Sequence, residues 1–175
     1  MKKNKKVFIA IILLCFVGIL IYSINSQAPR GDTVESQEKI LNRALQGGKN
    51  WTIYNAAYID NYQISGAYST NGKSAIVVFE KMDNGNSKLV LSTTENNDSI
   101  IVSGMIINQE WYDLIWFNGA QTEYAEITYT IPGEEKKTIR FDTSQMGVIY
   151  TPAVAETYSW NVIYHDEYGN TYKRP

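Results

Sequence analysis

The chain has 175 residues, a formal net charge of −2, one histidine and one cysteine. One cysteine excludes an intrachain disulfide, and one histidine excludes the histidine clusters on which most zinc sites and histidine-based catalysis depend. Five of the 16 lysines and arginines but none of the 18 acidic residues lie in the first 30 positions, so the remaining chain carries a formal charge of −7. An acidic surface repels phosphate backbones, which argues against a nucleic-acid partner.

The first 24 residues predict a membrane anchor. Residues 1–6 form a basic tip with four lysines, and residues 7–24 are an uncharged apolar run; the lysines are Lys2, Lys3, Lys5 and Lys6. A helix over this run is about 27 Å long, close to the roughly 30 Å of bilayer hydrocarbon. Because lysines flanking a span stay in the cytoplasm, the rest of the chain is expected outside the cell, as the extracytoplasmic part of a single-pass membrane protein.

A cleaved signal peptide is the alternative interpretation of this segment. The apolar run is longer than the roughly 7 to 15 residues of a typical signal core. Ser26 and Ala28 have the spacing of a cleavage site, but Pro29 follows them directly, and its rigid ring is expected to obstruct cleavage. An uncleaved anchor is therefore favoured, and cleavage would make the domain a secreted one.

Residues 25–32 are polar and predict a short tether, after which a helix is expected over about residues 33–46. Asp32 or Thr33 can cap the helix, and Gly47 with Gly48 ends it. One face of this helix is predicted to be apolar and to need a covering sheet or helix. Its residues are Val34, Ile40, Leu41, Ala44 and Leu45.

Residues 33–108 are predicted to form one subdomain, the helix on an antiparallel meander. Short runs of β-branched and aromatic residues alternate with Asn, Asp and Gly, which is typical of strands and turns. The expected strands are 51–58, 62–68, 74–81, 88–93 and 99–107. Residues 83–86 (DNGN) predict a hairpin turn between the third and the fourth, because Asn-Gly tolerates the positive φ of tight turns.

Residues 109–175 are predicted to form a second subdomain, shaped like a β-sandwich. The expected strands are 111–118, 123–131, 137–142, 147–150, 159–165 and 171–173. In the second of these, Ala125, Ile127 and Tyr129 alternate with polar residues and should face inward. Many short strands with frequent turns indicate an immunoglobulin-like architecture.

The predicted fold class is therefore α+β and mostly β, behind an N-terminal transmembrane helix. The order of anchor, helix, meander and sandwich resembles small membrane-anchored exoproteins of Gram-positive bacteria that remain uncharacterised. The densest match covers residues 112–131 (YDLIWFNGAQTEYAEITYTI), followed by 138–143 (TIRFDT) and the final hairpin. The resemblance implies the architecture and a bacterial cell envelope, but no activity.

No catalytic constellation, cofactor site or metal site is predicted. His165 has no serine in a nucleophile context and is interpreted as an exposed strand residue. The Asp- and Asn-rich segments 83–86, 95–98 and 166–170 are interpreted as turns, because none has the spacing of a calcium loop.

Asp113 is the one acid singled out, because its apolar neighbours in sequence would raise its pKa if they also surrounded it in space. The favoured interpretation is nevertheless a surface acid at a strand edge, for which substitution by Asn leaves function intact. Glu123 and Glu126 are conceivable cross-strand neighbours of Asp113, but sequence does not fix strand register.

Aromatic residues make up 13% of the chain. Residues 111–117 are apolar on both faces, which favours a central strand buried on both sides over an exposed patch. If a binding surface does exist here, its candidate residues are Trp111, Asp113, Trp116 and Tyr124.

These features favour a non-enzymatic, membrane-anchored domain that binds or positions a protein or a cell-envelope component. Two alternatives remain: an envelope hydrolase that uses a pair of carboxylates, and an accessory subunit of a membrane complex.

Overall fold

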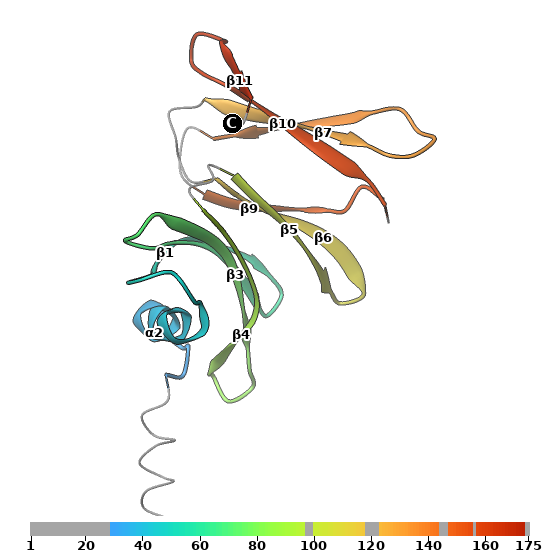
Figure 1. The fold of residues 1–175 in the computed structure, drawn as a ribbon. Helices are drawn as coiled ribbons and strands as arrows, with labels where there is room; N and C mark the ends of the chain where they lie inside the picture. Colours follow the sequence, from blue (N-terminus) through green and yellow to red (C-terminus); the bar gives the residue numbers. More distant parts are fainter. Residues whose placement is uncertain (1–28, 97–99, 118–122, 144–146, 156, 174–175) are drawn as a thin grey trace, which may run out of the picture.

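The computed structural model describes residues 29–96, 100–117, 123–143, 147–155 and 157–173. Within these ranges one helix and three antiparallel sheets form four layers (Figure 1). Among the described residues no helix has the length and apolar character needed to cross a membrane. The basic tip and the predicted anchor, residues 1–6 and 7–24, lie outside the described residues.

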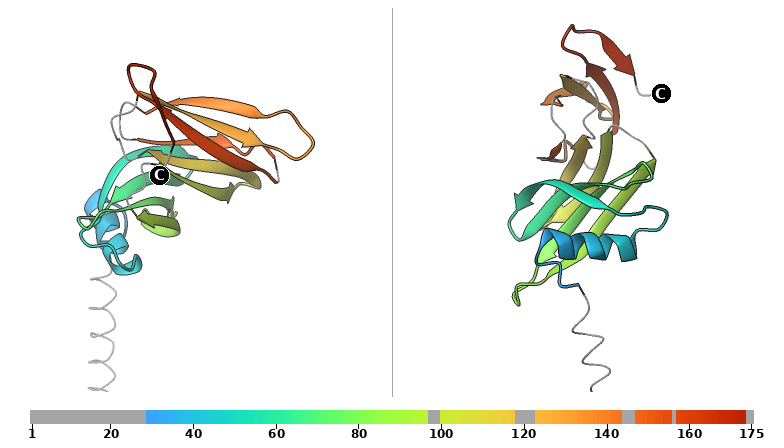
Figure 2. Two further views of the ribbon diagram at one scale, coloured as in Figure 1. Left: turned by 45° about the horizontal axis from the view of Figure 1, so that its top comes forward. Right: turned by 90° about the vertical axis from the view of Figure 1, so that its left-hand side faces the viewer.

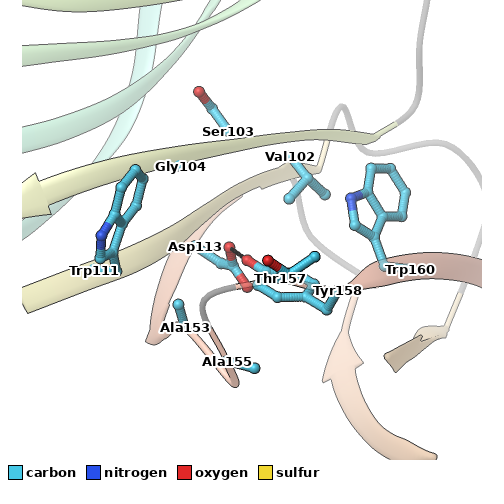
Figure 3. A pocket seen from close by; sticks show the side chains of 10 residues that line it. All are labelled: Val102, Ser103, Gly104, Trp111, Asp113, Ala153, Ala155, Thr157, Tyr158 and Trp160. Atoms are coloured by element: carbon cyan, nitrogen blue, oxygen red, sulfur yellow. Dashed lines mark hydrogen bonds between the residues drawn. The ribbon is translucent and has the colours of Figure 1, made fainter. Parts of the chain in front are cut away.

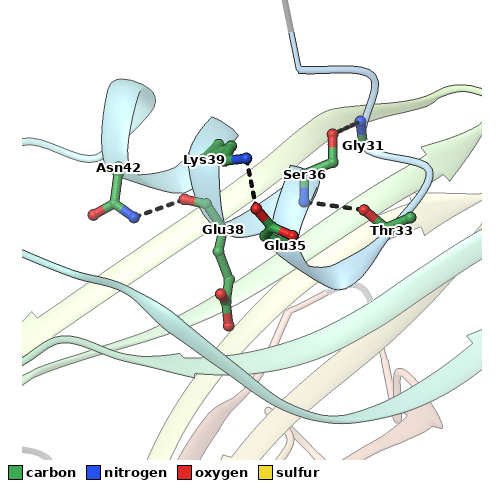
Figure 4. A network of polar contacts seen from close by, with 7 residues as sticks. All are labelled: Gly31, Thr33, Glu35, Ser36, Glu38, Lys39 and Asn42. Atoms are coloured by element: carbon green, nitrogen blue, oxygen red, sulfur yellow. Dashed lines mark hydrogen bonds and ion pairs between the residues drawn. The ribbon is translucent and has the colours of Figure 1, made fainter.

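The helix α2 (Val34–Ala44) begins at Thr33, whose hydroxyl accepts a hydrogen bond from the backbone N–H of Ser36 at 3.2 Å. Its capping and polar contacts are drawn in Figure 4. The helix ends before the predicted Gln46. Val34 is 52% exposed, contrary to the predicted apolar face, and the buried residues of the helix are Gln37 and Leu41.

The described end of the predicted tether is bound to the fold. The carbonyl oxygen of Arg30 accepts a hydrogen bond from the N–H of Ser87 at 2.8 Å, and the N–H of Gly31 donates to Ser36 Oγ at 2.7 Å. Gly31 has φ of 69°, and a Cβ there would lie 2.4 Å from the Ser87 carbonyl oxygen. Glycine is therefore required where the chain enters the domain.

The first sheet has the order β1-β2-β3-β4, as the predicted meander requires. Its strands are β1 (Thr52–Ile59), β2 (Tyr62–Tyr68), β3 (Lys73–Lys81) and β4 (Ser87–Asn96). The predicted hairpin turn joins β3 to β4, with Gly85 at φ of 82°. Figure 2 shows α2 lying across this sheet, where Leu41 and Leu45 pack with Trp51 and Phe79.

The middle sheet has the order β5-β6-β9. Its strands are β5 (Ile100–Ile107), β6 (Glu110–Phe117) and β9 (Gly147–Pro152). One face packs on the first sheet through Leu114 and Trp116, and the other packs on the third sheet through Ile115 and Phe117. The predicted division between residues 108 and 109 falls in the turn of the β5–β6 hairpin, whose strands share this sheet.

The third sheet has the order β11-β10-β7-β8. Its strands are β7 (Tyr124–Thr130), β8 (Lys137–Asp142), β10 (Ser159–His165) and β11 (Thr171–Lys173). Ala125, Ile127 and Tyr129 face inward as predicted and are buried against the middle sheet. The mostly β fold class, with antiparallel sheets and one short helix among the described residues, is thus confirmed.

Candidate functional site

The four predicted ligand residues do not form one surface. Trp111 and Asp113 share one face of β6, because they are two residues apart on a strand. Trp116 lies on the opposite face and is completely buried in the core between the first two sheets. Tyr124 lies on the outer face of the third sheet. The structure therefore brings together only Trp111 and Asp113.

Asp113 is buried, with 2% of its surface exposed. Its strand is the middle one of three, so Asp113 lies between Gly104 on β5 and Thr151 on β9, and the third sheet covers its face. The interpretation of Asp113 as a surface acid at a strand edge is wrong. Glu126 pairs with Arg140 and Ile163 in the third sheet, so it is no cross-strand neighbour of Asp113.

Described residues of the connection between β9 and β10 contact β6 at Trp111 and Asp113. The connection begins at Ala153, whose N–H donates to the Trp111 carbonyl oxygen at 2.9 Å, and it ends at Tyr158, whose hydroxyl donates to Asp113 Oδ1. The Tyr158 ring packs edge-on against Tyr129, with 5.4 Å between ring centroids. The pKa of both tyrosines is raised well above the ordinary tyrosine value. Burial is the larger cause, and the nearby Asp113 carboxylate raises the pKa further. Both phenols therefore remain protonated near neutral pH.

A cavity of about 360 Å³ opens beside this carboxylate, and we call it the Asp113 pocket (Figure 3). Strands β5 and β6 supply one side, and the segment from β9 to the start of β10 supplies the other. In Figure 3 the indoles of Trp111 and Trp160 lie on either side of Asp113. They are 57% and 37% exposed. The lining residues are Val102, Ser103, Gly104, Trp111, Asp113, Ala153, Ala155, Thr157, Tyr158 and Trp160.

The polar groups of the pocket are incompletely paired. Asp113 Oδ2 and the Tyr129 hydroxyl are buried and form no hydrogen bond of normal geometry among the described residues, although the two side chains interact, since Asp113 helps to raise the pKa of Tyr129. The described ion pairs are Lys39–Glu35 and His165–Glu126, and none of the ten lining residues is a lysine, arginine or histidine. A carboxylate in such a place favours a ligand that brings hydrogen-bond donors or positive charge.

Sequence reasoning missed Thr157, Tyr158 and Trp160 as site residues. The alternation of β10 does place Trp160 on the inward face with Val162 and Tyr164, as the structure confirms through their pairing with Tyr129, Ile127 and Ala125. That alternation identifies a face but not the residue of another sheet that lies opposite it. The contact between Tyr158 and Asp113 joins positions 45 residues apart, and no local pattern encodes it.

A second polar cluster lies on the outer face of the third sheet. The Tyr124 ring stacks on His165 at 4.2 Å between centroids, and the Arg140 guanidinium carbon lies 3.5 Å from the Tyr124 centroid. His165 Nε2 lies 3.2 Å from Glu126 Oε2. The His165 side chain is only 12% exposed, so its interpretation as an exposed strand residue is wrong. Each of these groups already has a partner, and the cluster joins β7, β8 and β10.

Asp and Asn side chains in two of the Asp- and Asn-rich segments accept hydrogen bonds from the backbone of their own turns. Asp166 Oδ1 accepts hydrogen bonds from the N–H groups of Tyr168 and Asn170 at 2.9 and 2.8 Å, and Asn84 Oδ1 accepts one from the N–H of Asn86 at 3.0 Å. No three histidine, cysteine or acidic side chains within the described ranges are grouped closely enough to hold a metal ion. In the segment 95–98 the interpretation as a turn is wrong for Glu95 and Asn96, which lie in β4 and pair with β3, and residues 97 and 98 lie outside the described ranges.

Comparison with known proteins gives no relative: no protein-family model, no curated protein and no solved structure matches the chain.

Proposed function

We propose that this chain is a single-pass membrane protein whose extracytoplasmic domain binds a component of the cell envelope in the Asp113 pocket. The observation that carries the proposal is the buried Asp113 carboxylate between two partly exposed indoles, beside a cavity of about 360 Å³. Ligand sites typically combine an apolar or aromatic lining with a few convergent polar groups. The apolar run at residues 7–24 supports the membrane location.

The lining favours binding over hydrolysis. Glycosidases that work without histidine use two carboxyl groups about 5 to 9 Å apart across the scissile bond. Asp113 is the single acid among the ten lining residues that the structure describes. Its Oδ1 already accepts the Tyr158 hydrogen bond, which fixes the orientation of the carboxyl group.

The strand order supports an immunoglobulin-like sandwich as the frame of the site. Numbered from β5 onward, the two packed sheets have the orders 1-2-5 and 4-3-6-7. The order 1-2-5 matches the A-B-E grouping of immunoglobulin-type domains, and strands 3, 6 and 7 of the other sheet match the C-F-G grouping. Such domains commonly bind through loops and sheet edges on a rigid scaffold. Residues of the connection between strands five and six, which are β9 and β10, line the Asp113 pocket.

Photocrosslinking in intact cells tests the proposal. Thr157 is exposed on the pocket lip, whereas Lys136 is exposed in the β7–β8 connection and does not line the pocket. A photoreactive amino acid at position 157 of the full-length chain is expected to capture an envelope component, and the same group at position 136 is expected not to capture it. Equal capture at both positions, or none at 157, would contradict binding of an envelope component in the pocket.

A further inference from the structure

We propose that the Asp113 pocket recognises a primary alkylammonium group, with the cation near the Asp113 carboxylate and the alkyl chain between Trp111 and Trp160. This inference rests on the proposed binding function and specifies the chemical class of the ligand.

Charge is the first argument. A carboxylate that is 98% buried is normally paired with a cation, because an isolated buried charge is unfavourable. The ten described lining residues include no basic side chain. The chain beyond residue 30 also has an excess of acids over bases, so long-range attraction brings cations toward the domain and repels anions.

Hydrogen bonding is the second argument, and it distinguishes a primary ammonium from a quaternary one. A primary ammonium carries three N–H donors and no acceptor. The pocket offers acceptor atoms in the Asp113 carboxylate and in the hydroxyls of Thr157 and Tyr158, whereas the Ser103 hydroxyl is hydrogen-bonded to Thr93 on the opposite face of β5. Asp113 Oδ2 accepts no hydrogen bond of normal geometry among the described residues, although the Tyr129 phenol interacts with this carboxylate. An N–H donor that reaches Oδ2 satisfies that oxygen.

The two indoles are the third argument. Trp is the aromatic side chain whose face attracts cations most strongly, and it also packs against alkyl chains. Trp111 and Trp160 keep 57% and 37% of their surface exposed although they flank a buried charge. A ligand that fills the pocket covers apolar surface on both rings while its cation approaches the carboxylate.

A saccharide is the main competing ligand, because sugar rings also stack on Trp and their hydroxyls donate to carboxylates. Saccharide recognition uses several polar side chains, both donors and acceptors, around the ring. The charged or polar side chains that face this pocket are Asp113, Thr157 and Tyr158, and none is an amide or a basic group. The lining therefore favours a compact cation with an apolar tail.

The test is a titration observed at the four tryptophans. The full-length chain is prepared in a nonionic polyoxyethylene detergent with fluorinated tryptophan, so that Trp51, Trp111, Trp116 and Trp160 each give one fluorine NMR signal. Trp51 and Trp116 are buried away from the pocket and act as internal controls. n-Butylammonium is expected to shift the signals of Trp111 and Trp160 saturably, and to leave those of Trp51 and Trp116 in place.

Matched probes separate charge from shape. 1-Butanol has a similar chain without charge, and butyrate reverses the charge, so both are expected to bind at least tenfold more weakly than n-butylammonium. Tetramethylammonium keeps the charge but has no N–H donor, and we expect it to bind several-fold more weakly. N-Acetylglucosamine is the saccharide probe. Binding of 1-butanol or N-acetylglucosamine as tight as that of n-butylammonium would overturn the inference.

Variants locate the interaction. Asp113→Asn keeps the shape and an acceptor for Tyr158 but removes the charge, so n-butylammonium is expected to bind about tenfold more weakly or worse. Glu134→Gln makes the same charge change in an exposed turn and is the control. Trp111→Leu is expected to weaken binding about two- to fivefold. An Asp113→Asn protein that binds n-butylammonium as the parent does would overturn the proposal.

The two proposals fail in different ways. Capture at position 157 in cells, combined with no response of Trp111 and Trp160 to n-butylammonium, leaves the binding function standing and rejects the ammonium class. A selective response to n-butylammonium without any capture at position 157 rejects the envelope component and retains the cation site.

Discussion

At the scale of single residues, Asp113 combines burial with incomplete pairing. Tyr158 donates to one carboxylate oxygen, and the other accepts no hydrogen bond of normal geometry among the described residues. Asn has the same shape, still accepts the Tyr158 hydrogen bond and removes a buried charge that lacks a counter-ion. We therefore expect Asp113→Asn to leave the free energy of unfolding unchanged within about 1 kcal/mol or to raise it.

Urea unfolding at neutral pH, followed by near-UV circular dichroism, measures this effect. A loss of more than about 2 kcal/mol for Asp113→Asn would mean that the carboxylate supports the fold. A loss of ligand binding at unchanged stability would separate a functional from a structural role for Asp113.

The two tyrosines beside Asp113 make stability depend on alkaline pH. Their pKa values are raised in the folded protein by burial and by the carboxylate. A raised folded pKa means that the unfolded chain loses the phenol proton first. The stabilisation is complete below the ordinary tyrosine pKa of 10.0 and is lost as pH rises above it. Each phenol contributes a slope of up to about 1.4 kcal/mol per pH unit there.

Urea unfolding measured at several values between pH 9 and pH 12 tests this effect. Tyr158→Phe is expected to flatten the decline, because one of the two titrating phenols is removed. Tyr58→Phe is the control, since Tyr58 is largely exposed and lies on β1, away from the pocket. An identical pH dependence in Tyr158→Phe and the parent protein would contradict the assignment.

At this scale the sequence identified Asp113 as an unusual acid, but it did not predict which residues surround Asp113 in the fold. Asp113 stands among aromatic and aliphatic neighbours in the sequence, yet the partners that matter come from other elements. Tyr158 belongs to the segment before β10, and Tyr129 belongs to β7. Side chains from different sheets meet through the packing of whole layers, which strand alternation does not encode.

At the scale of elements, strand β6 has two different buried faces. Residues 114–117 are buried as the apolar pattern predicted, but Trp111 at the start of the strand is exposed. The packing of Trp116 depends on Gly66 of β2, where an added Cβ would lie 2.0 Å from the Trp116 ring. The ring is completely buried and has no room to move away.

Gly66→Ala is therefore expected to destabilise the protein by about 1 to 3 kcal/mol or more, because it overpacks the core between the first and the middle sheet. Thermal and urea unfolding measure the change. Gly104→Ala is the matched control: it is also a strand glycine, but an added Cβ lies 3.5 Å from the Trp111 ring, an ordinary contact. Equal stability of the two variants would contradict this account of the core.

The periodic elements were the most predictable part of the fold. All eleven described strands were expected from alternation and turn residues, with small shifts at their ends. The helix was less well predicted, because Gln37 is buried and Val34 exposed. Gln37 Nε2 donates to the Gly31 carbonyl oxygen and to Gln63 Oε1, both at 3.0 Å. Because the hydrogen bonds of Gln37 are satisfied inside the fold, this polar residue can be buried, and a pattern that counts only apolar side chains does not predict its burial.

At the scale of the whole molecule, the layers succeed one another in chain order from α2 to the third sheet, except that β9 returns to the middle sheet after β8 (Figure 1). The described chain starts at Pro29 beside α2, whereas the Asp113 pocket lies between the middle and the third sheet. Stacked layers are about 10 Å apart, so the pocket is two layers, or roughly 20 Å, from the helix. If residues 7–24 span the membrane, the domain presents this pocket away from the point where the chain enters the bilayer.

Cysteine labelling tests the orientation that this arrangement needs. In a Cys15→Ser background, which removes the one natural cysteine, Lys136→Cys places a thiol in the exposed β7–β8 connection and Lys5→Cys places one in the basic tip. With lysines on the cytoplasmic side, a membrane-impermeant maleimide should label position 136 in intact cells and position 5 only after permeabilisation. Labelling of position 5 but not of position 136 in intact cells would reverse the topology. That result would also rule out an envelope component as the ligand. The amine titration of the purified chain would still decide the chemistry of the pocket.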